Sequence, residues 1–302
     1  MVKKSGAGGK AEHELGVSFS VAFSPRGDVL ATCAKRRVIV WTVLPWTIRW
    51  ESNALKDPSD LAFSPDGSCI AAKNTSGRLV LFDARDGAVR RVLDKGAGEG
   101  SAPVFSQDGA LLAHGSWDGD VWVLDVESGK TIGHRSFAGE MIRAIHRFDS
   151  GWLVVRSPTT ATGTPGGERA TFLPLDLGGE RDESLAIGDA DHTTVAPGGR
   201  VLAVSRSHQR ELALVEIPSG RVLATTRAKF GGTGAAVCFG DGLLGSVQEG
   251  RVEILRASTL EHLGGLEVPY PSDVAFSPDG SLVAFGSWSD GSVMKVSEVL
   301  TL

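Results

Sequence analysis

One short segment, His114-Gly115-Ser116-Trp117-Asp118, contains the residue types of a hydrolytic triad. Triad chemistry needs the serine and the histidine within hydrogen-bond reach, and a carboxylate that orients the histidine. Here the three groups follow one another through the expected end of a strand and a tight turn, where serine and aspartate commonly bond to the backbone. The segment therefore indicates a structural role. We assign no catalytic residue and expect a protein that is not an enzyme.

Phosphate and metal chemistry find equally little support. The segment GAGEGS at 96–101 does not open a helix after a strand, and SGAGGKA at 5–11 has Ala11 where a phosphate-binding loop needs Ser or Thr. The seven histidines show no paired spacing that would build a tetrahedral metal site. We therefore expect no cofactor and no metal.

A repeated sequence must position whatever functional residues there are. An apolar stretch, a turn rich in Ser, Pro, Asp and Gly, and a second apolar stretch recur, as in VAFSPRGDVLAT at 21–32 and LAFSPDGSCIAA at 61–72. Seven marker residues precede these turns, at intervals of 37 to 50 residues: Phe23, Phe63, Phe105, Ile145, Val195, Phe239 and Phe276. A repeat of about forty residues is typical of propellers and solenoids.

Each repeat predicts four short strands. After the two apolar stretches comes an alternating segment, such as VIVW or LVLFD, and then a fourth segment that ends the repeat. One four-stranded sheet cannot bury both faces, whereas seven packed around an axis can. We predict an all-β fold, a seven-bladed β-propeller of four-stranded antiparallel blades. Residues 1–9 would form a flexible tail, and 10–302 a single domain.

The chain ends predict how the ring closes. Only six residues follow SVMKV at 292–296, too few for a fourth strand and its turn, while AEHELG at 11–16 resembles the fourth-strand segment LEHLGG at 260–265. We predict that the N-terminal segment supplies the outer strand of the seventh blade, which removes an exposed edge. The longest interval places an insertion at 156–169, for which a functional loop and tolerated surface variation are equally favoured.

The repeats resemble the WD40 family of β-propellers over nearly the whole chain. The resemblance rests on the F-S-P-D-G turns and on four third-strand endings: Trp41-Thr42, Phe82-Asp83, Leu124-Asp125 and Val215-Glu216. Only Trp41 keeps the tryptophan of the namesake dipeptide, and the Gly-His pair near the repeat start is mostly absent. The resemblance implies a non-enzymatic scaffold that binds proteins or peptides. It also implies that the fourth-to-first and second-to-third strand loops share the binding face.

Mapping the sequence onto those loops gives nine candidate partner-binding residues. Trp117 and Trp288 occupy matching second-to-third strand turns; the others lie in the equivalent turns or just before first strands: Arg36, Lys73, Arg156, Arg206, Arg143, His192 and Tyr270. Trp, Tyr and Arg are the side chains most enriched at binding hot spots. The basic residues would suit an acidic or phosphorylated peptide. Packing of the two turn tryptophans over their own blades is an equally favoured alternative.

Composition narrows the class of partner. The net charge of −5 and the lack of a basic stretch argue against nucleic acid, and no run of about 18 apolar residues indicates a membrane span. Three scattered cysteines fit a reducing cytoplasm, and we expect a monomer. The alternative function is an enzyme or a small-ligand binder that uses the central channel; its candidate residues are Asp60, Asp191, His192 and Asp273.

Overall fold

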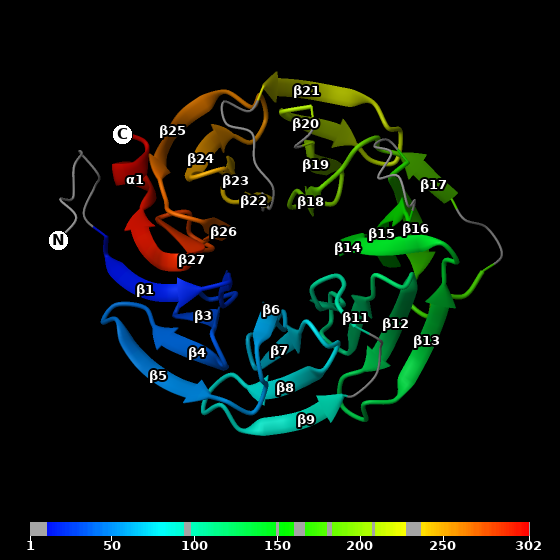
Figure 1. The fold of residues 1–302 in the computed structure, drawn as a ribbon, viewed down its shortest axis with the longest axis horizontal. Coiled ribbons are helices and arrows are strands. Elements are labelled where there is room, and N and C mark those ends of the chain that lie inside the picture. The colour runs from blue at the N-terminus through cyan, green and yellow to red at the C-terminus, as the bar shows by residue number, and fades with distance from the viewer. Residues whose placement is uncertain are drawn as a thin grey trace.

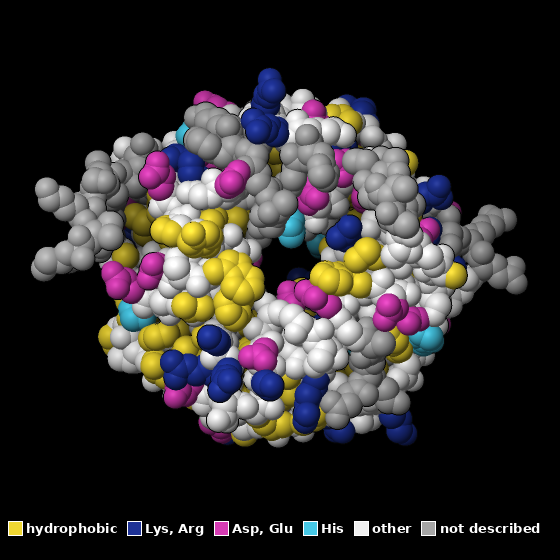
Figure 2. Space-filling model, viewed as in Figure 1, with side chains coloured by type: hydrophobic (Ala, Val, Ile, Leu, Met, Phe, Trp, Pro, Cys, Tyr) yellow, Lys and Arg dark blue, Asp and Glu magenta, His cyan; other side chains and the backbone are white. Residues whose placement is uncertain are grey.

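The strands form a ring of seven sheets around a central axis (Figure 1), and the space-filling view shows a channel at its centre (Figure 2). The computed structural model describes residues 11–93, 98–148, 151–159, 167–179, 183–206, 209–227 and 237–301. The predicted tail at 1–9 lies outside the described residues. Each of the seven marker residues falls on the innermost strand of one sheet, which confirms the seven-bladed propeller.

The first four blades each contain four antiparallel strands in sequence order. Blade 1 has β2 (Ser20–Phe23), β3 (Val29–Ala34), β4 (Arg37–Thr42) and β5 (Thr47–Ser52). Blade 2 has β6 (Pro58–Phe63), β7 (Cys69–Asn74), β8 (Leu79–Asp83) and β9 (Val89–Leu93). Blade 3 has β10 (Val104–Phe105), β11 (Leu111–Gly115), β12 (Asp120–Asp125) and β13 (Thr131–Ser136). Blade 4 has β14 (Glu140–Phe148), β15 (Gly151–Pro158), β16 (Arg169–Pro174) and β17 (Glu183–Ala186).

The last three blades complete the ring. Blade 5 has β18 (His192–Val195), β19 (Val201–Arg206), β20 (Glu211–Glu216) and β21 (Val222–Arg227). Blade 6 has β22 (Val237–Phe239), β23 (Leu243–Gln248), β24 (Arg251–Arg256) and β25 (His262–Glu267). Blade 7 has β26 (Pro271–Phe276), β27 (Leu282–Lys295) and β1 (His13–Ser18), and β27 supplies both the second and the third strand. The helix α1 (Val296–Val299) follows, and no helix in the described residues is long and apolar enough to cross a membrane.

The N-terminal strand closes the ring, as predicted. β1 pairs antiparallel with β27, with His13 opposite Val293 and Glu14 opposite Ser292. Leu15 is buried in a cluster with Leu30 of blade 1 and Val293 of blade 7. The imidazole of His13 stacks on the indole of Trp46, with ring centroids 5.0 Å apart. The two ends of the chain therefore meet in one sheet that packs on blade 1.

The recurring turns follow from short-range hydrogen bonds. In blades 2, 3 and 7 the serine hydroxyl of the turn donates to the aspartate two residues later, at 2.6 Å, as Ser64 does to Asp66. Gly67 follows with φ +74°, a left-handed conformation that favours glycine. A Cβ at Gly67 would lie 3.5 Å from the ring of Pro25 in blade 1, so these turns pack against those of the preceding blade.

The antiparallel order of the strands divides the connections between two faces. The second-to-third strand turns and the connections between blades lie on one face, which we call the upper face and which Figure 2 shows. The first-to-second and third-to-fourth strand turns lie on the opposite, lower face. The predicted insertion in blade 4 falls between β15 and β16, on the upper face, and its residues 160–166 are outside the described part of the chain.

Candidate interaction face

Trp117 and Trp288 hold equivalent positions on the upper face. The backbone N–H of Trp117 donates to the carbonyl oxygen of Glu99 at 2.7 Å, and the backbone N–H of Trp288 donates to the carbonyl oxygen of Tyr270 at 3.0 Å. Each bond ties a second-to-third strand turn to the connection that enters the same blade. Trp117 is 41% exposed, Trp288 64% and Tyr270 74%. These three side chains therefore project large apolar surfaces from the loops.

Trp288 and Tyr270 belong to a group of aromatic residues at the junction of blades 7 and 1. The Trp288 ring lies against Phe19, with centroids 4.4 Å apart. The Phe19 N–H donates to the carbonyl oxygen of Cys33, which connects this group to strand β3. We call Phe19, Tyr270 and Trp288 the aromatic sector. Phe19 was absent from the predicted site because it precedes a strand without being part of a turn motif.

Basic residues lie next to the aromatic sector. Lys35 and Arg36 are exposed in the turn between β3 and β4, and Lys56 is exposed in the connection to blade 2. Their side chains form no hydrogen bond or ion pair with any described residue. We call these three residues the basic sector. Figure 2 shows lysine and arginine side chains gathered over blades 1 and 2, and hydrophobic side chains over blade 7 beside the channel.

Lys73 takes a different place from the one its turn position indicated. Its side chain is 1% exposed, and its ammonium donates to the carbonyl oxygens of Gly115, at 2.7 Å, and Ser101, at 3.2 Å. Burial lowers the pKa of Lys73 to about 8. Lys73 therefore joins blade 2 to blade 3 and presents no charge at the surface.

Arg156 and Arg206 are engaged within their own blades. The Arg156 guanidinium pairs with Glu140 at 2.6 Å and donates to the hydroxyl of Thr171 at 2.8 Å. Arg206 pairs with Glu211, opposite it on the neighbouring strand, and donates to the carbonyl oxygen of Ile187 at 2.9 Å. The acidic partners neutralise both charges, so neither arginine extends the basic sector.

Arg143 and His192 lie near the channel on blades 4 and 5. Arg143 is the extra residue of a bulge in β14, and its side chain is exposed and donates to the hydroxyl of Ser157 at 2.8 Å. His192 begins β18 directly after Asp191, and burial lowers the pKa of its imidazole below the ordinary value. Both lie away from the aromatic sector, which is on blades 7 and 1.

The channel candidates Asp60 and Asp273 occupy equivalent positions, each following a Pro-Ser pair and a bulge in the first strand. An Asp273 carboxylate oxygen accepts the N–H of Val21 on blade 1 at 2.9 Å, and Asp60 accepts the hydroxyl of Ser59 at 2.7 Å. Burial raises the pKa of both, that of Asp273 to about 6. In the described residues no three His, Cys, Asp or Glu side chains are placed to hold a metal ion. These contacts indicate that Asp273 fastens blade 7 to blade 1.

The triad-like segment of blade 3 is spread over separate contacts. The His114 ring is buried and stacks on Trp122, with centroids 5.2 Å apart. The Ser116 hydroxyl accepts the N–H of Asp120 at 3.3 Å and so helps to close the turn. The arrangement does not assemble a nucleophile with a base, and the upper face remains the best candidate site.

A closed ring of seven four-stranded blades defines a β-propeller protein. Residues 11–42 and 259–294 match the family described as WD domain, G-beta repeat. Each matched segment begins at an outer strand, β1 or β25, and ends at the third strand of the next blade, so the matches span blade junctions. The two matched segments and the seven-bladed ring together support a WD40-repeat β-propeller.

Several relatives are similar to part of the chain. Echinoderm microtubule-associated protein-like 4 of Xenopus laevis is 31% identical over 129 residues, which is 39% of this chain and 14% of that protein. Echinoderm microtubule-associated protein-like 2 of Homo sapiens is 31% identical over 129 residues, again 39% of this chain and 20% of the relative. The match thus covers at most a fifth of the length of these two relatives.

Proposed function

We propose that this propeller is a non-enzymatic protein-interaction scaffold and that its partner docks on the upper face, over the aromatic and basic sectors. The exposure of Tyr270 and Trp288 carries this proposal. Large aromatic side chains contribute most to binding free energy when a partner covers them. Although the protein has an extensive core, Tyr270 and Trp288 remain exposed to solvent on adjacent loops. The proposed site is therefore centred on the junction of blades 7, 1 and 2, whereas the nine predicted residues are spread over more of the upper face.

The two sectors would recognise different parts of one partner segment. An apolar side chain of the partner would pack on Trp288 and Tyr270, while acidic side chains would meet Lys35, Arg36 and Lys56. Ion pairs at such an exposed surface are worth about 1 kcal/mol or less each and weaken with salt. The aromatic sector would therefore supply most of the affinity, and the basic sector the preference for an acidic segment.

Trp117 offers a second contact on the far side of the channel. Its surroundings differ, because Glu99 and Asp118 are exposed beside it. A partner segment long enough to cross the channel would reach an apolar contact with acidic neighbours there. We propose that Trp117 extends the interface and that the aromatic sector is its centre.

The relatives suggest the first partner to test. Their names describe microtubule association, so we propose a cytoplasmic, monomeric protein whose partner belongs to the microtubule cytoskeleton. Co-sedimentation of the purified chain with polymerised tubulin tests this directly. A chain that stays in the supernatant would refute the microtubule proposal while leaving the upper-face site open to other proteins.

The docking site itself is tested with matched variants. Immobilised wild type would be compared with Trp288→Ser/Tyr270→Ser and with Ile132→Ser, which alters an exposed apolar residue on the outer strand β13. Melting curves of all three proteins are the control, because Trp288 also packs on Phe19 and the double variant must remain folded at the assay temperature. We expect the double variant to lose a specific partner that wild type and the Ile132 variant retain. Equal retention by all three proteins would refute the proposed site.

A further inference from the structure

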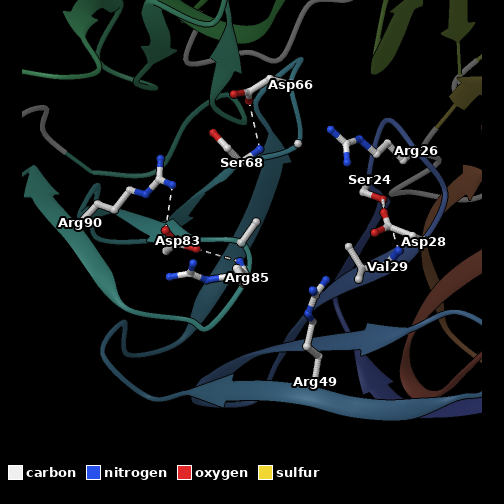
Figure 3. A pocket seen from close by; sticks show the side chains of 12 residues that line it. Ser24, Arg26, Asp28, Val29, Arg49, Asp66, Ser68, Asp83, Arg85 and Arg90 are labelled. Atoms are coloured by element: carbon white, nitrogen blue, oxygen red, sulfur yellow. Dashed lines mark hydrogen bonds and ion pairs between the residues drawn. The ribbon is translucent and has the colours of Figure 1, made fainter.

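A pocket of about 340 Å³ opens on the lower face between blades 1 and 2. Its walls come from the first-to-second strand turns of both blades, from strand β5 and from the turn between β8 and β9. Figure 3 shows arginines on several sides of this space: Arg26, Arg49, Arg85 and Arg90. The volume is within the range of small-molecule sites, which begins at about 300 Å³.

At this pocket the turn of blade 1 differs from the turns of blades 2, 3 and 7. Arg26 occupies the turn position that Asp66, Asp108 and Asp279 occupy in blades 2, 3 and 7. In those blades the aspartate accepts the hydroxyl of the turn serine. In blade 1 the Ser24 hydroxyl donates instead to Asp28, two residues further on, at 2.8 Å. The turn is therefore closed by a hydrogen bond that does not involve Arg26, and the Arg26 side chain lines the pocket.

The carboxylates of the pocket are already engaged. Asp66 accepts the hydroxyl of Ser64 and the N–H of Ser68, while Asp83 accepts the N–H of Arg85 and pairs with Arg90 at 2.9 Å. By contrast, Arg26 and Arg49 form no hydrogen bond or ion pair with any described residue. Figure 3 shows both side chains bordering the open space between the two blades. Two guanidinium groups therefore remain available to a ligand.

We propose that this pocket binds a phosphate monoester through Arg26 and Arg49. Guanidinium groups bind phosphate oxygens in pairs of parallel hydrogen bonds and keep their charge at any physiological pH. A phosphate monoester carries a charge of about −1.5 to −2 near pH 7. Two guanidinium groups therefore attract a phosphate monoester more strongly than they attract a carboxylate group, which carries only a single negative charge. A small phosphorylated molecule and a phosphorylated side chain share this chemistry.

The turn of blade 2 supplies the decisive variant. The double variant Arg26→Asp/Asp28→Ser gives blade 1 the Ser-Pro-Asp-Gly-Ser sequence of blades 2 and 7. The turn should therefore fold with the hydrogen bond from the serine hydroxyl to the aspartate that those blades have. Arg49→Gln tests the second guanidinium independently of the turn. Arg221→Gln is the control, because Arg221 is exposed and paired with Glu216 in blade 5.

Inorganic phosphate, phosphoserine and a phosphoserine peptide would be titrated into the full chain at low salt, with binding followed by calorimetry. We expect saturable binding by wild type and by the Arg221 variant, and about tenfold weaker binding after loss of either pocket arginine. Binding of all three probes would indicate small phosphorylated molecules as sufficient ligands, and binding of the peptide alone would indicate a phosphorylated side chain. Unchanged affinity in both pocket variants, or no saturable binding of any probe, would overturn the proposal. The upper-face site is tested separately.

Discussion

Leu15 provides the sharpest test of how the ring is closed. This buried side chain of β1 belongs to the hydrophobic cluster that joins blade 7 to blade 1 and that includes Leu30 and Val293. Replacing a buried leucine by alanine removes its packing and leaves a cavity, at a cost of about 2 to 5 kcal/mol. We expect Leu15→Ala to lower the free energy of unfolding by about 3 kcal/mol. At about 2 °C for each kcal/mol, this is a fall of about 6 °C in Tm.

A matched variant on the same strand isolates the effect of burial. Val17 lies on β1 but is exposed, so Val17→Thr should change the stability by less than about 0.5 kcal/mol. Deleting residues 1–17 should lower Tm further than Leu15→Ala, because it also leaves β27 as an open edge. Melting followed by circular dichroism compares the variants. A Leu15→Ala protein that melts with the wild type would refute the closure described here.

Two further predictions concern buried charges. Because burial raises the pKa of Asp273 to about 6, the folded protein holds this proton to a higher pH than the unfolded chain does. As the pH rises from about 4 to about 6, the free energy of unfolding of the wild type should therefore fall relative to that of Asp273→Asn, by on the order of 2 kcal/mol. Thermal melts of both proteins at each pH measure this difference. A difference that does not change with pH would contradict the prediction. Lys73→Met should lower the free energy of unfolding by about 1 to 3 kcal/mol, because two buried carbonyl oxygens lose their donor. Arg36→Met, in the corresponding exposed turn, should melt within about 1 °C of the wild type.

The architecture was predictable because its determinants are local. The hydrogen bond that shapes each turn spans two residues, as between Ser64 and Asp66, and such short-range chemistry is visible in the sequence. The matching positions of Trp117 and Trp288 were predictable for the same reason, since each is counted from a turn within its own repeat. Closure by the N-terminal segment followed from the strand missing at the other end.

Which of the predicted binding residues are exposed on the upper face was less predictable, because the burial of a side chain depends on contacts between blades. The acceptors of Lys73 lie 28 and 42 residues further along the chain, so nothing near Lys73 indicates that it is buried. A local signal did exist for Arg206, whose partner Glu211 faces it across the hairpin. The sequence also shows Arg26 at the turn position where blades 2, 3 and 7 have aspartate. That Arg26 borders a pocket could not be predicted, because this depends on the bond between Ser24 and Asp28 and on the position of blade 2.

Hydrogen exchange of the propeller, alone and with the partner captured by wild type, tests the central claim most directly. We predict slower exchange on partner binding in three segments of the upper face: the turn at 34–37, the connection at 268–271 and the turn at 287–290. The outer strand β13 should exchange at the same rate in both states. Protection confined to outer strands or to the lower face, with these three segments unchanged, would contradict docking on the aromatic and basic sectors.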